Sequence, residues 1–400
     1  MNKFTGLEYL KIDIANNAGL DKADWQERID WVNKNIDSLE DITDLDEPAQ
    51  YYAGVQALRD HQAGKPSGYP ISLDASASGL QILAALCGDV VAGKICNIVN
   101  TGHNRDAYTE VYKVMQNLGA SDGIDREDVK SAVMPSFYGS TAAPKRVFGE
   151  GHNYMVFQQA MGESMPAVWK LIKLFLDIWD NQRLTYEWVL PDNFHVVIKT
   201  MDKDVEVVSF NGHRYEVPYK VHRPINNGRH LAANVTHSLD GMVVREMQAR
   251  IQHDPEQVRT VKRILYTVPS SEEVLDTHDA RMVLKLWNHY SESGFLSSRI
   301  IEHINEDTVS LIPNRYAVLK LLESFPEKPF HMIVNHDCFR VLPNNGNDLR
   351  QQYINVLAEL AESNMLQFIL RQLVLNPKLT VKKESDDLAS LIREADYPLT

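Results

Sequence analysis

Two short apolar segments, each followed by an aspartate, constrain this chain more than any other feature. Pro70–Leu73 is typical of a buried strand and is followed by Asp74. His331–Asn335 is a second strand-like run, and it leads into His336 and Asp337. The two aspartates lie far apart in the sequence, so only the fold can bring them together. Carboxylates on neighbouring strands can hold two Mg²⁺ ions about 3.5–4 Å apart for phosphoryl transfer. The alternative is that each aspartate begins an ordinary turn after a strand.

A helix is expected over Asp125–Tyr138, and it carries a slanted stripe of side chains. Residues four apart lie on one face of a helix, and here they are Arg126, Lys130, Met134 and Tyr138. The two cations suit a triphosphate, and the tyrosine suits its sugar or base. The alternative is a solvated basic face with no ligand. Pro135 lacks a backbone donor, so we expect a kink there.

The other elements are mixed in kind and order. Helices are expected over Lys22–Leu39, Ser78–Val91, Ala107–Leu118, Met242–Arg250 and Asp348–Leu370. Residues 254–328 are charged and are expected to be mostly helical, with one helix starting near Ser270–Ser271. Residues 188–223 are rich in strand formers, and Asn211–Gly212 is a strong hairpin signal. The polar tail after Leu375 ends in Asp396–Thr400. The pattern favours an α+β fold.

Charge and cysteine content narrow the function. The formal net charge is −13, so binding to DNA cannot depend on an overall positive field and needs local basic grooves, metal ions or a partner. Cys87, Cys96 and Cys338 show no CxxC spacing, which argues against a disulfide framework and fits a reducing cytoplasm. No apolar run approaches the roughly 18 residues of a membrane span. No phosphate loop or nucleophile elbow is present.

Four motifs in order resemble the phage-type single-subunit RNA polymerases, which include the mitochondrial enzymes. They are Asp74–Gln81 (DASASGLQ), like motif A; Arg126–Ser140, with the stripe described above, like motif B; His237–Gly241 (HSLDG); and His336–Phe339 (HDCF), like motif C. Tyr9–Ile12 and Asn16–Lys22 also look like the family's approach to motif A. The resemblance implies a right-hand polymerase fold with a discontinuous palm and a mainly helical fingers lobe.

The resemblance also implies roles for individual residues, which are expected to act together in two-metal catalysis. Asp74, Asp337 and the carbonyl of Ala75 are expected to bind the metal ions, and Arg126, Lys130 and Lys11 the triphosphate. Tyr138, His237 and Gly79 are expected to recognise the ribose, and His336 to contact the RNA 3′ end. Asp74, Asp337, Lys130 and Tyr138 are the expected catalytic residues.

Two positions favour ribonucleotides over deoxyribonucleotides. The nearest rival is a family A DNA polymerase, which carries a glutamate five residues after the motif A aspartate and typically another after His-Asp of motif C. This chain has Gly79 and Cys338 at those places. A glycine leaves room for the 2′-hydroxyl, and Tyr138 with His237 can form hydrogen bonds to it. A site that rejects a sugar lacking this hydroxyl must contain groups that bond the hydroxyl.

The resemblance divides the chain into a first palm segment (1–91), fingers (92–237) and a second palm segment (238–400). The second palm segment contains a helical insertion at about 242–330, which either binds a partner or is a solvated decoration. Complete family members carry several hundred residues before this region, and no DxxGR element precedes Asp74. The layout is most similar to the larger chain of the split two-chain polymerase of N-four-type podophages.

The expected protein is therefore the catalytic chain of a DNA-directed RNA polymerase, active with a second polypeptide as a heterodimer. Its other partners are a DNA template, the RNA transcript, NTPs and a recruiting DNA-binding protein, in the host cytoplasm if it is viral. The alternative of another class is a non-catalytic, nucleic-acid-binding or assembly subunit that keeps the polymerase-like fold.

Overall fold

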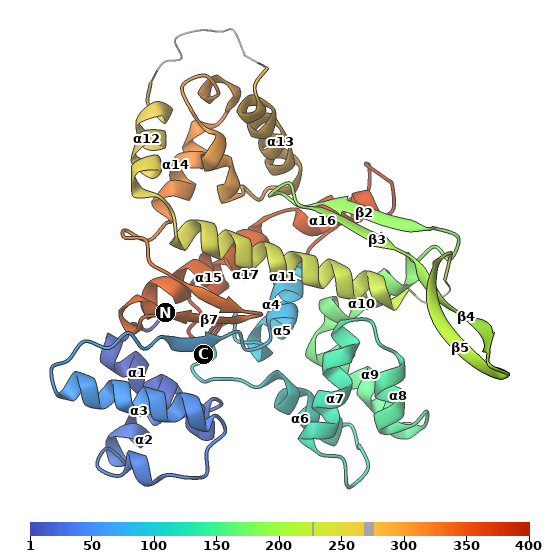
Figure 1. Cartoon of the computed structure of the whole chain (residues 1–400), viewed down its shortest axis with the longest axis horizontal. Helices are drawn as coiled ribbons and strands as arrows, with labels where there is room; N and C mark the ends of the chain where they lie inside the picture. Colours follow the sequence, from blue (N-terminus) through green and yellow to red (C-terminus); the bar gives the residue numbers. More distant parts are fainter. Residues whose placement is uncertain (226–227, 268–275) are drawn as a thin grey trace.

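A small antiparallel sheet joins two distant parts of the chain (Figure 1). The computed structural model describes all residues except 226–227 and 268–275. The strand order is β1-β7-β6, where β1 is Ile71–Asp74, β6 is Ile333–Asn335 and β7 is Cys338–Val341. Asp74 lies opposite Cys338, and β6 and β7 form a hairpin. The two expected strands, β1 and β6, thus lie on either side of β7, which is not among the expected strands, and the fold is mixed helix and sheet.

Alternation of side chains explains why these strands form at the centre. Ile71 and Leu73 of β1 are buried, as are Phe339 and Val341 of β7. In a strand, successive side chains point to opposite faces. The apolar residues therefore enter the core, and Asp74 at the strand's end is exposed.

The amino-terminal segment packs beside the sheet as three helices, drawn in blue in Figure 1. They are α1 (Gly6–Ala15), α2 (Trp25–Lys34) and α3 (Pro48–Gln62), with a π-helical turn at Asn16–Leu20. Capping boxes of Thr5 with Glu8 and of Asp24 with Glu27 start α1 and α2. The helix expected over Lys22–Leu39 is therefore shorter at both ends.

The helix expected over Ser78–Val91 is interrupted. It forms α4 (Ser78–Cys87) and α5 (Val90–Ile95), separated at Gly88. Gly88 has φ +69°, and a Cβ on it would lie 2.4 Å from the carbonyl oxygen of Ser385. The helix must end there because only glycine accepts both the left-handed conformation and this close approach.

A group of helices follows, at the lower right of Figure 1. It consists of α6 (Ala107–Asn117), α7 (Arg126–Phe137), α8 (Ala142–Phe148), α9 (His152–Ser164) and α10 (Pro166–Asp177). The expected helices α6 and α7 are both present. Pro135 lies in the last turn of α7 and cannot donate to the carbonyl of Ser131; the helix ends two residues later, at Phe137.

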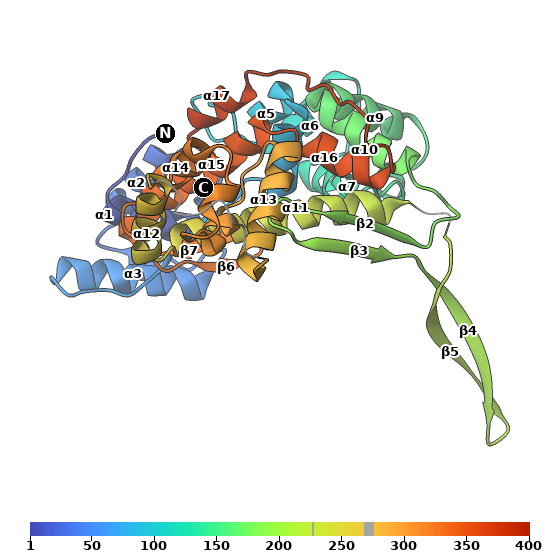
Figure 2. The same ribbon diagram turned by 90° about the horizontal axis from the view of Figure 1, so that it is seen from above.

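Two hairpins form the β-rich stretch. β2 (Thr185–Val189) pairs with β3 (His195–Lys199), and β4 (Met201–Phe210) pairs with β5 (His213–His222). Asn211 and Gly212, with φ of 50° and 78°, form the expected turn. Figure 2 shows the β4–β5 hairpin extending away from the rest of the molecule.

Helix α11 (Arg229–Ile251) is far longer than the helix expected over Met242–Arg250. It crosses the molecule between the sheet and the lobe above it (Figure 1). Its amino-terminal half contains His237, Ser238 and Asp240, which are weak helix formers. Packing of its buried residues, among them Leu231 and Leu239, overrides that local preference.

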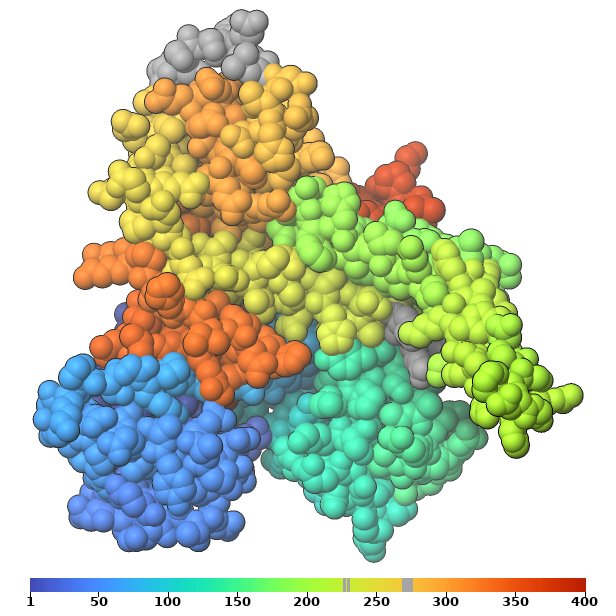
Figure 3. Space-filling model, in the orientation of Figure 1, coloured from blue at the N-terminus to red at the C-terminus, as the bar shows by residue number. Residues whose placement is uncertain are grey.

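A second lobe has its own small core. It contains α12 (Pro255–Leu265), α13 (His278–Ser293), the 3₁₀ helix η3 (Ser298–His303) and α14 (Arg315–Glu323), and its buried residues form a cluster distinct from the main core. Figure 3 shows it as a separate mass above α11. The helix start expected at Ser270–Ser271 lies outside the described residues.

The carboxy-terminal segment returns to the sheet. After α15 (Gly346–Glu362), α16 (Met365–Leu373) and α17 (Leu388–Arg393), the backbone of Thr400 exchanges two hydrogen bonds with Asp74. Tyr397 and Leu399 are buried, so the end of the polar tail is part of the packed structure. Within the described residues, no helix has both the length and the apolar character needed to cross a membrane.

Candidate active site

The two aspartates that end the strands meet at one end of the sheet. Asp74 is the last residue of β1, and Asp337 lies in the two-residue turn between β6 and β7. The amide of Ala75 donates a hydrogen bond to the carbonyl oxygen of Asp337 at 3.1 Å. His336, the other turn residue, has a left-handed φ of 57° and is exposed. The surface is hollowed between the amino-terminal helices and the helices around α7, beneath the β6–β7 hairpin (Figure 3).

The carboxylates of this pair repel each other. Desolvation and then the negative charge of Asp337 raise the pKa of Asp74 to about 6, whereas the cation of Lys22 lowers it. One nearby lysine therefore does not balance the two acidic groups. Oxygen donors carrying excess negative charge are the ligands that a divalent cation such as Mg²⁺ prefers.

A third acid comes from α11. Desolvation and the charge of Asp337 raise the pKa of Asp240, while His237, a hydrogen bond from Ser78 and His336 lower it. Residues of motif A, motif C and HSLDG therefore interact with one another near Asp74 and Asp337. The motif HSLDG, which has a regular helical backbone, presents its histidine and aspartate to this site.

The end of α7 faces α11 and α4. The ring of Tyr138 stacks on that of His237, with centroids 4.8 Å apart and planes 10° apart. Desolvation and the charges of Asp240 and Asp337 raise the pKa of Tyr138, so its hydroxyl keeps its proton. A Cβ built on Gly79 would lie 3.8 Å from the Tyr138 hydroxyl oxygen and 3.2 Å from a methyl group of Thr236. Only a residue without a side chain leaves this space open.

The start of α7 presents a positioned arginine. Arg126 Nε donates to a carboxylate oxygen of Asp106 at 2.6 Å and to Thr109 Oγ1 at 3.2 Å, and its guanidinium lies over the ring of Tyr108. The hydrogen bond that Arg126 donates to Asp106 raises the pKa of Arg126, which stays charged. Glu127 makes a further ion pair with it. The guanidinium is about one third exposed, so an anionic ligand can still reach it.

The two expected lysines differ in their surroundings. Lys130 lies on the same face of α7 as Arg126, is 45% exposed, and has Glu127 at 3.9 Å. Lys11 donates to Asn33 on α2 at 2.7 Å and is not among the charges that act on Asp74. The structure thus brings Lys130 to the stripe and leaves Lys11 bonded within the amino-terminal helices.

Three site residues are missed when the sequence is interpreted alone. Lys22 acts on the carboxylates of both Asp74 and Asp106; Asp106 holds Arg126; Asp240 adds a third acid. Lys22 and Asp240 lie within segments that resemble family motifs, which is the signal that could have found them. For Asp106 the only signal is its position before α6, where it also caps the helix.

The remaining polar residues of motif A bind the carboxy-terminal tail. Ser76 Oγ donates to the carbonyl of Tyr397 at 2.9 Å, and Gln81 Nε2 donates to that of Pro398 at 3.0 Å. Tyr353 donates to the Gln81 amide oxygen at 2.8 Å. These contacts hold the segment that carries Asp74 in place from the side opposite to β7.

Comparison with known proteins gives a partial match. Residues 3–153 match the model of a family described as DNA-dependent RNA polymerase. A probable DNA-directed RNA polymerase of Neurospora crassa is 33% identical over 159 residues, 34% of this chain and 18% of that protein. T7 RNA polymerase of Escherichia phage T7 is 30% identical over 139 residues, 31% and 15% of the respective chains. The mitochondrial DNA-directed RNA polymerase of Schizosaccharomyces pombe is 30% identical over 166 residues, 34% and 14%.

Each match covers less than a fifth of the relative's own length. The segment matched by the family model contains Asp74, Gly79 and the stripe of α7, whereas His237, Asp240 and Asp337 lie beyond it. The family resemblance is therefore confirmed, and the closer likeness to a split podophage chain stays a prediction. Through residues 3–153, this chain is related to the single-subunit DNA-dependent RNA polymerases of phages and mitochondria.

Proposed function

We propose that this chain is the catalytic part of a DNA-directed RNA polymerase, which transfers nucleoside monophosphates from NTPs to an RNA 3′ end. The observation that carries the proposal is the meeting of Asp74 and Asp337, linked through the 3.1 Å backbone hydrogen bond between Ala75 and Asp337. The sheet with its helices would serve as the palm, and the group α6–α10 as the fingers.

Asp74, Asp337 and the carbonyl of Ala75 are the residues that would hold two Mg²⁺ ions. The fit rests on the meeting of two carboxylates with the single cation of Lys22 nearby, and on the oxygen donors that Mg²⁺ prefers. When bound, such ions stabilise charge on the attacking and leaving oxygens of phosphoryl transfer.

Arg126 and Lys130 bind the triphosphate and neutralise the leaving pyrophosphate in this proposal. Asp106 positions Arg126 by the hydrogen bond at 2.6 Å, and Lys22 adds a cation between the acidic and basic parts of the site. Lys11 would have to leave Asn33 to reach a phosphate. His336 contacts the RNA 3′ end.

Tyr138, His237 and Gly79 select the ribose. The tyrosine hydroxyl faces the open space at Gly79, and the stacked ring of His237 restricts its orientation. A sugar with a 2′-hydroxyl can fill that space and bond the tyrosine, whereas a deoxyribose leaves the half-buried hydroxyl without this partner.

We also propose that extension requires a second polypeptide and a DNA template, as in the split enzymes of N-four-type podophages, with a DNA-binding protein recruiting the complex. Support comes from the family resemblance. Purification of a tagged chain from its native source, followed by identification of bound proteins, tests this part separately. Recovery of the chain alone under conditions where it extends a primer would contradict it.

Binding by the isolated chain tests the site without depending on a partner. Mn²⁺ binding, measured by electron paramagnetic resonance, is expected to be at least about tenfold weaker in Asp74→Asn and Asp337→Asn than in the wild type, since each variant loses one charged ligand. Asp122→Asn, an exposed aspartate in a loop before α7, is the matched control. Equal Mn²⁺ binding by folded Asp74→Asn and the control would reject the metal assignment.

Primer extension on a DNA template then tests the activity in the copurified complex. Both site variants are expected to lose extension, and the control to retain it. A wild-type complex that binds template and NTPs yet never extends the primer would favour a non-catalytic subunit with a polymerase-like fold.

A further inference from the structure

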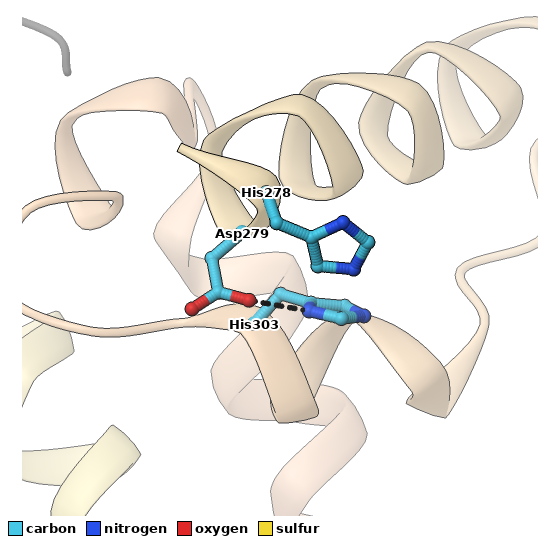
Figure 4. A group of neighbouring side chains, drawn as sticks. All are labelled: His278, Asp279 and His303. Carbon is cyan, nitrogen blue, oxygen red and sulfur yellow. Dashed lines mark hydrogen bonds and ion pairs between the residues drawn. The ribbon is translucent and has the colours of Figure 1, made fainter. Parts of the chain in front are cut away.

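A group of metal-binding side chains lies outside the candidate active site, in the second lobe. His278, Asp279 and His303 each offer one ligand atom, and these atoms all lie within 4.8 Å of one another. Figure 4 shows the two imidazole rings one above the other, with the carboxylate beside the lower ring. Their lobe is separate from the β1–β7–β6 sheet in Figure 1.

The histidine of η3 is held in a defined state. His303 Nδ1 lies 2.9 Å from a carboxylate oxygen of Asp279. An ionised carboxylate can only accept, so Nδ1 carries the proton and the neutral ring has its lone pair on Nε2. Carboxylates orient metal-binding histidines through the second ring nitrogen in this way.

The other nitrogen of this ring has no partner. His303 is about nine-tenths buried, and its Nε2 is enclosed without a hydrogen bond among the residues that the structure describes. Buried polar atoms normally have a partner. The ring of His278 lies edge to face with that of His303, with centroids 5.7 Å apart, so a second nitrogen donor is close by.

We propose that His278 and Nε2 of His303 bind a divalent transition-metal ion, for which Zn²⁺ is the best match, while Asp279 orients His303 from the opposite side of its ring. Histidine nitrogens are typical zinc ligands, at about 2.0–2.1 Å. Neighbouring ligands of a tetrahedral ion lie about 3.3 Å apart at those bond lengths. The exposed His278 can turn its ring toward His303 Nε2 to meet this spacing. Water completes the coordination on the side of the exposed His278.

The support around the carboxylate fits the same purpose. The Asn305 amide donates to the second oxygen of Asp279 at 3.3 Å. Asn305 is itself fixed, because its side-chain oxygen accepts from the amides of Asp307 and Thr308. Asp279 is therefore oriented by one neighbour while it orients His303.

The ion would join the first turn of α13 to the end of η3. Both elements contribute to the small core of the second lobe. A metal that binds only the folded lobe stabilises it, and small cores often depend on such a link. The inference is independent of the polymerase proposal, because none of its residues belongs to the candidate active site.

Zinc titration of the full chain, after removal of metals with a chelator, tests the proposal. The wild type is expected to bind a single tight Zn²⁺ and to melt at a higher temperature with the ion. His278→Asn removes an exposed ligand without disturbing the core, and we expect at least about tenfold weaker binding and loss of the thermal shift. Asp279→Asn keeps an acceptor for His303 but loses the charge, so an intermediate affinity is expected.

His61→Asn, an exposed histidine on α3, is the matched control and should bind as the wild type does. Substitution of Co²⁺ for Zn²⁺ gives a readout of its own, because bands in the visible spectrum typical of tetrahedral cobalt should appear in the wild type and disappear in His278→Asn. Equal zinc affinity in the wild type and His278→Asn, or no tight zinc in the wild type, would overturn the assignment.

Discussion

Replacing Asp74 with asparagine should stabilise the metal-free protein while removing the proposed polymerase activity. The aspartate lies against Asp337, and desolvation together with that charge raises its pKa from 3.8 to about 6. Asparagine has the same shape and no charge. The substitution therefore removes the repulsion between the two side chains without opening a cavity.

The magnitude follows from the raised pKa. A difference of about two pKa units corresponds to about 3 kcal/mol at full strength. Asp74 is exposed at the strand's end, so water screens the repulsion, and we expect about 1 kcal/mol. For a chain of this length unfolding as one unit, that is about 1 °C in Tm, from the usual unfolding entropy per residue.

The pH dependence has a definite sign. Because the pKa of Asp74 is higher in the folded than in the unfolded state, ionisation costs stability above pH 6, and the cost disappears as the pH falls from 6 to below 3.8. Differential scanning calorimetry in a chelator, at pH 8 and at pH 4, measures it. Asp74→Asn should melt higher than the wild type at pH 8 and equally at pH 4.

Added Mg²⁺ should reverse the order at pH 8. The ion is expected to raise the Tm of the wild type and to have little effect on Asp74→Asn, because the variant lacks one charged ligand. Asp122→Asn serves as the control for removal of an unrelated charge. If Asp74→Asn melted lower than the wild type at pH 8 without metal, the carboxylates would not repel each other and the reasoning would be refuted.

Three further predictions concern neighbouring groups. Tyr138→Phe should admit dNTPs, because the hydroxyl that faces Gly79 is lost; competition between ATP and dATP in primer extension by the complex measures this, and unchanged discrimination would remove Tyr138 from ribose selection. Asp106→Asn should raise the KM for NTPs by about tenfold, which corresponds to about 1.4 kcal/mol, by loosening Arg126; an unchanged KM in steady-state extension would show that Arg126 needs no support. Arg250→Met should destabilise the fold by about 3–5 kcal/mol. The fully buried guanidinium pairs with Glu359 and Glu246, and its loss leaves their charges unpaired. A melting temperature equal to that of the wild type would contradict this.

Local signals allowed much of the site to be predicted. The strand before Asp74, the stripe of α7 and the turn at Asn211–Gly212 all follow from periodicity or from residues with special backbone preferences. In α7 the four stripe residues are partly or fully exposed on one face, while Val129 and Val133 are buried. The expectation of a shared face is thus confirmed, although the ligands assigned to it stay predictions.

Non-local contacts explain what sequence reasoning could not reach. Gly88 ends α4 because the carbonyl of Ser385 approaches it, and α11 is long because its buried side chains pack against several other elements. Likewise, nothing near His278 in the sequence indicates that His303 will lie beside it. Such features depend on which distant segments meet, and local preference carries no information about that.

The distribution of charge in the site divides it into two parts with opposite requirements. The charge of Asp337 raises the pKa values of both Asp74 and Asp240, and Lys22 is the cation that lowers the pKa of Asp74. Repulsion among these acids lowers the free energy of unfolding unless a cation is bound. At the start of α7, Asp106 holds Arg126, whose guanidinium is still about one third exposed and can attract an anion.

A ligand that matches both parts must carry a positive charge for the three acids and a negative charge for the cations of α7. A phosphate anion alone would not reduce the repulsion among the three acids. A metal ion alone would not use the partly exposed cations of Arg126 and Lys130. The magnesium nucleotide of the proposed function carries both charges in one molecule. The backbone pairing of β1 with β7 and with Thr400 holds the acids together before such a ligand binds, so the repulsion is built into the fold and binding of the complementary ligand releases it.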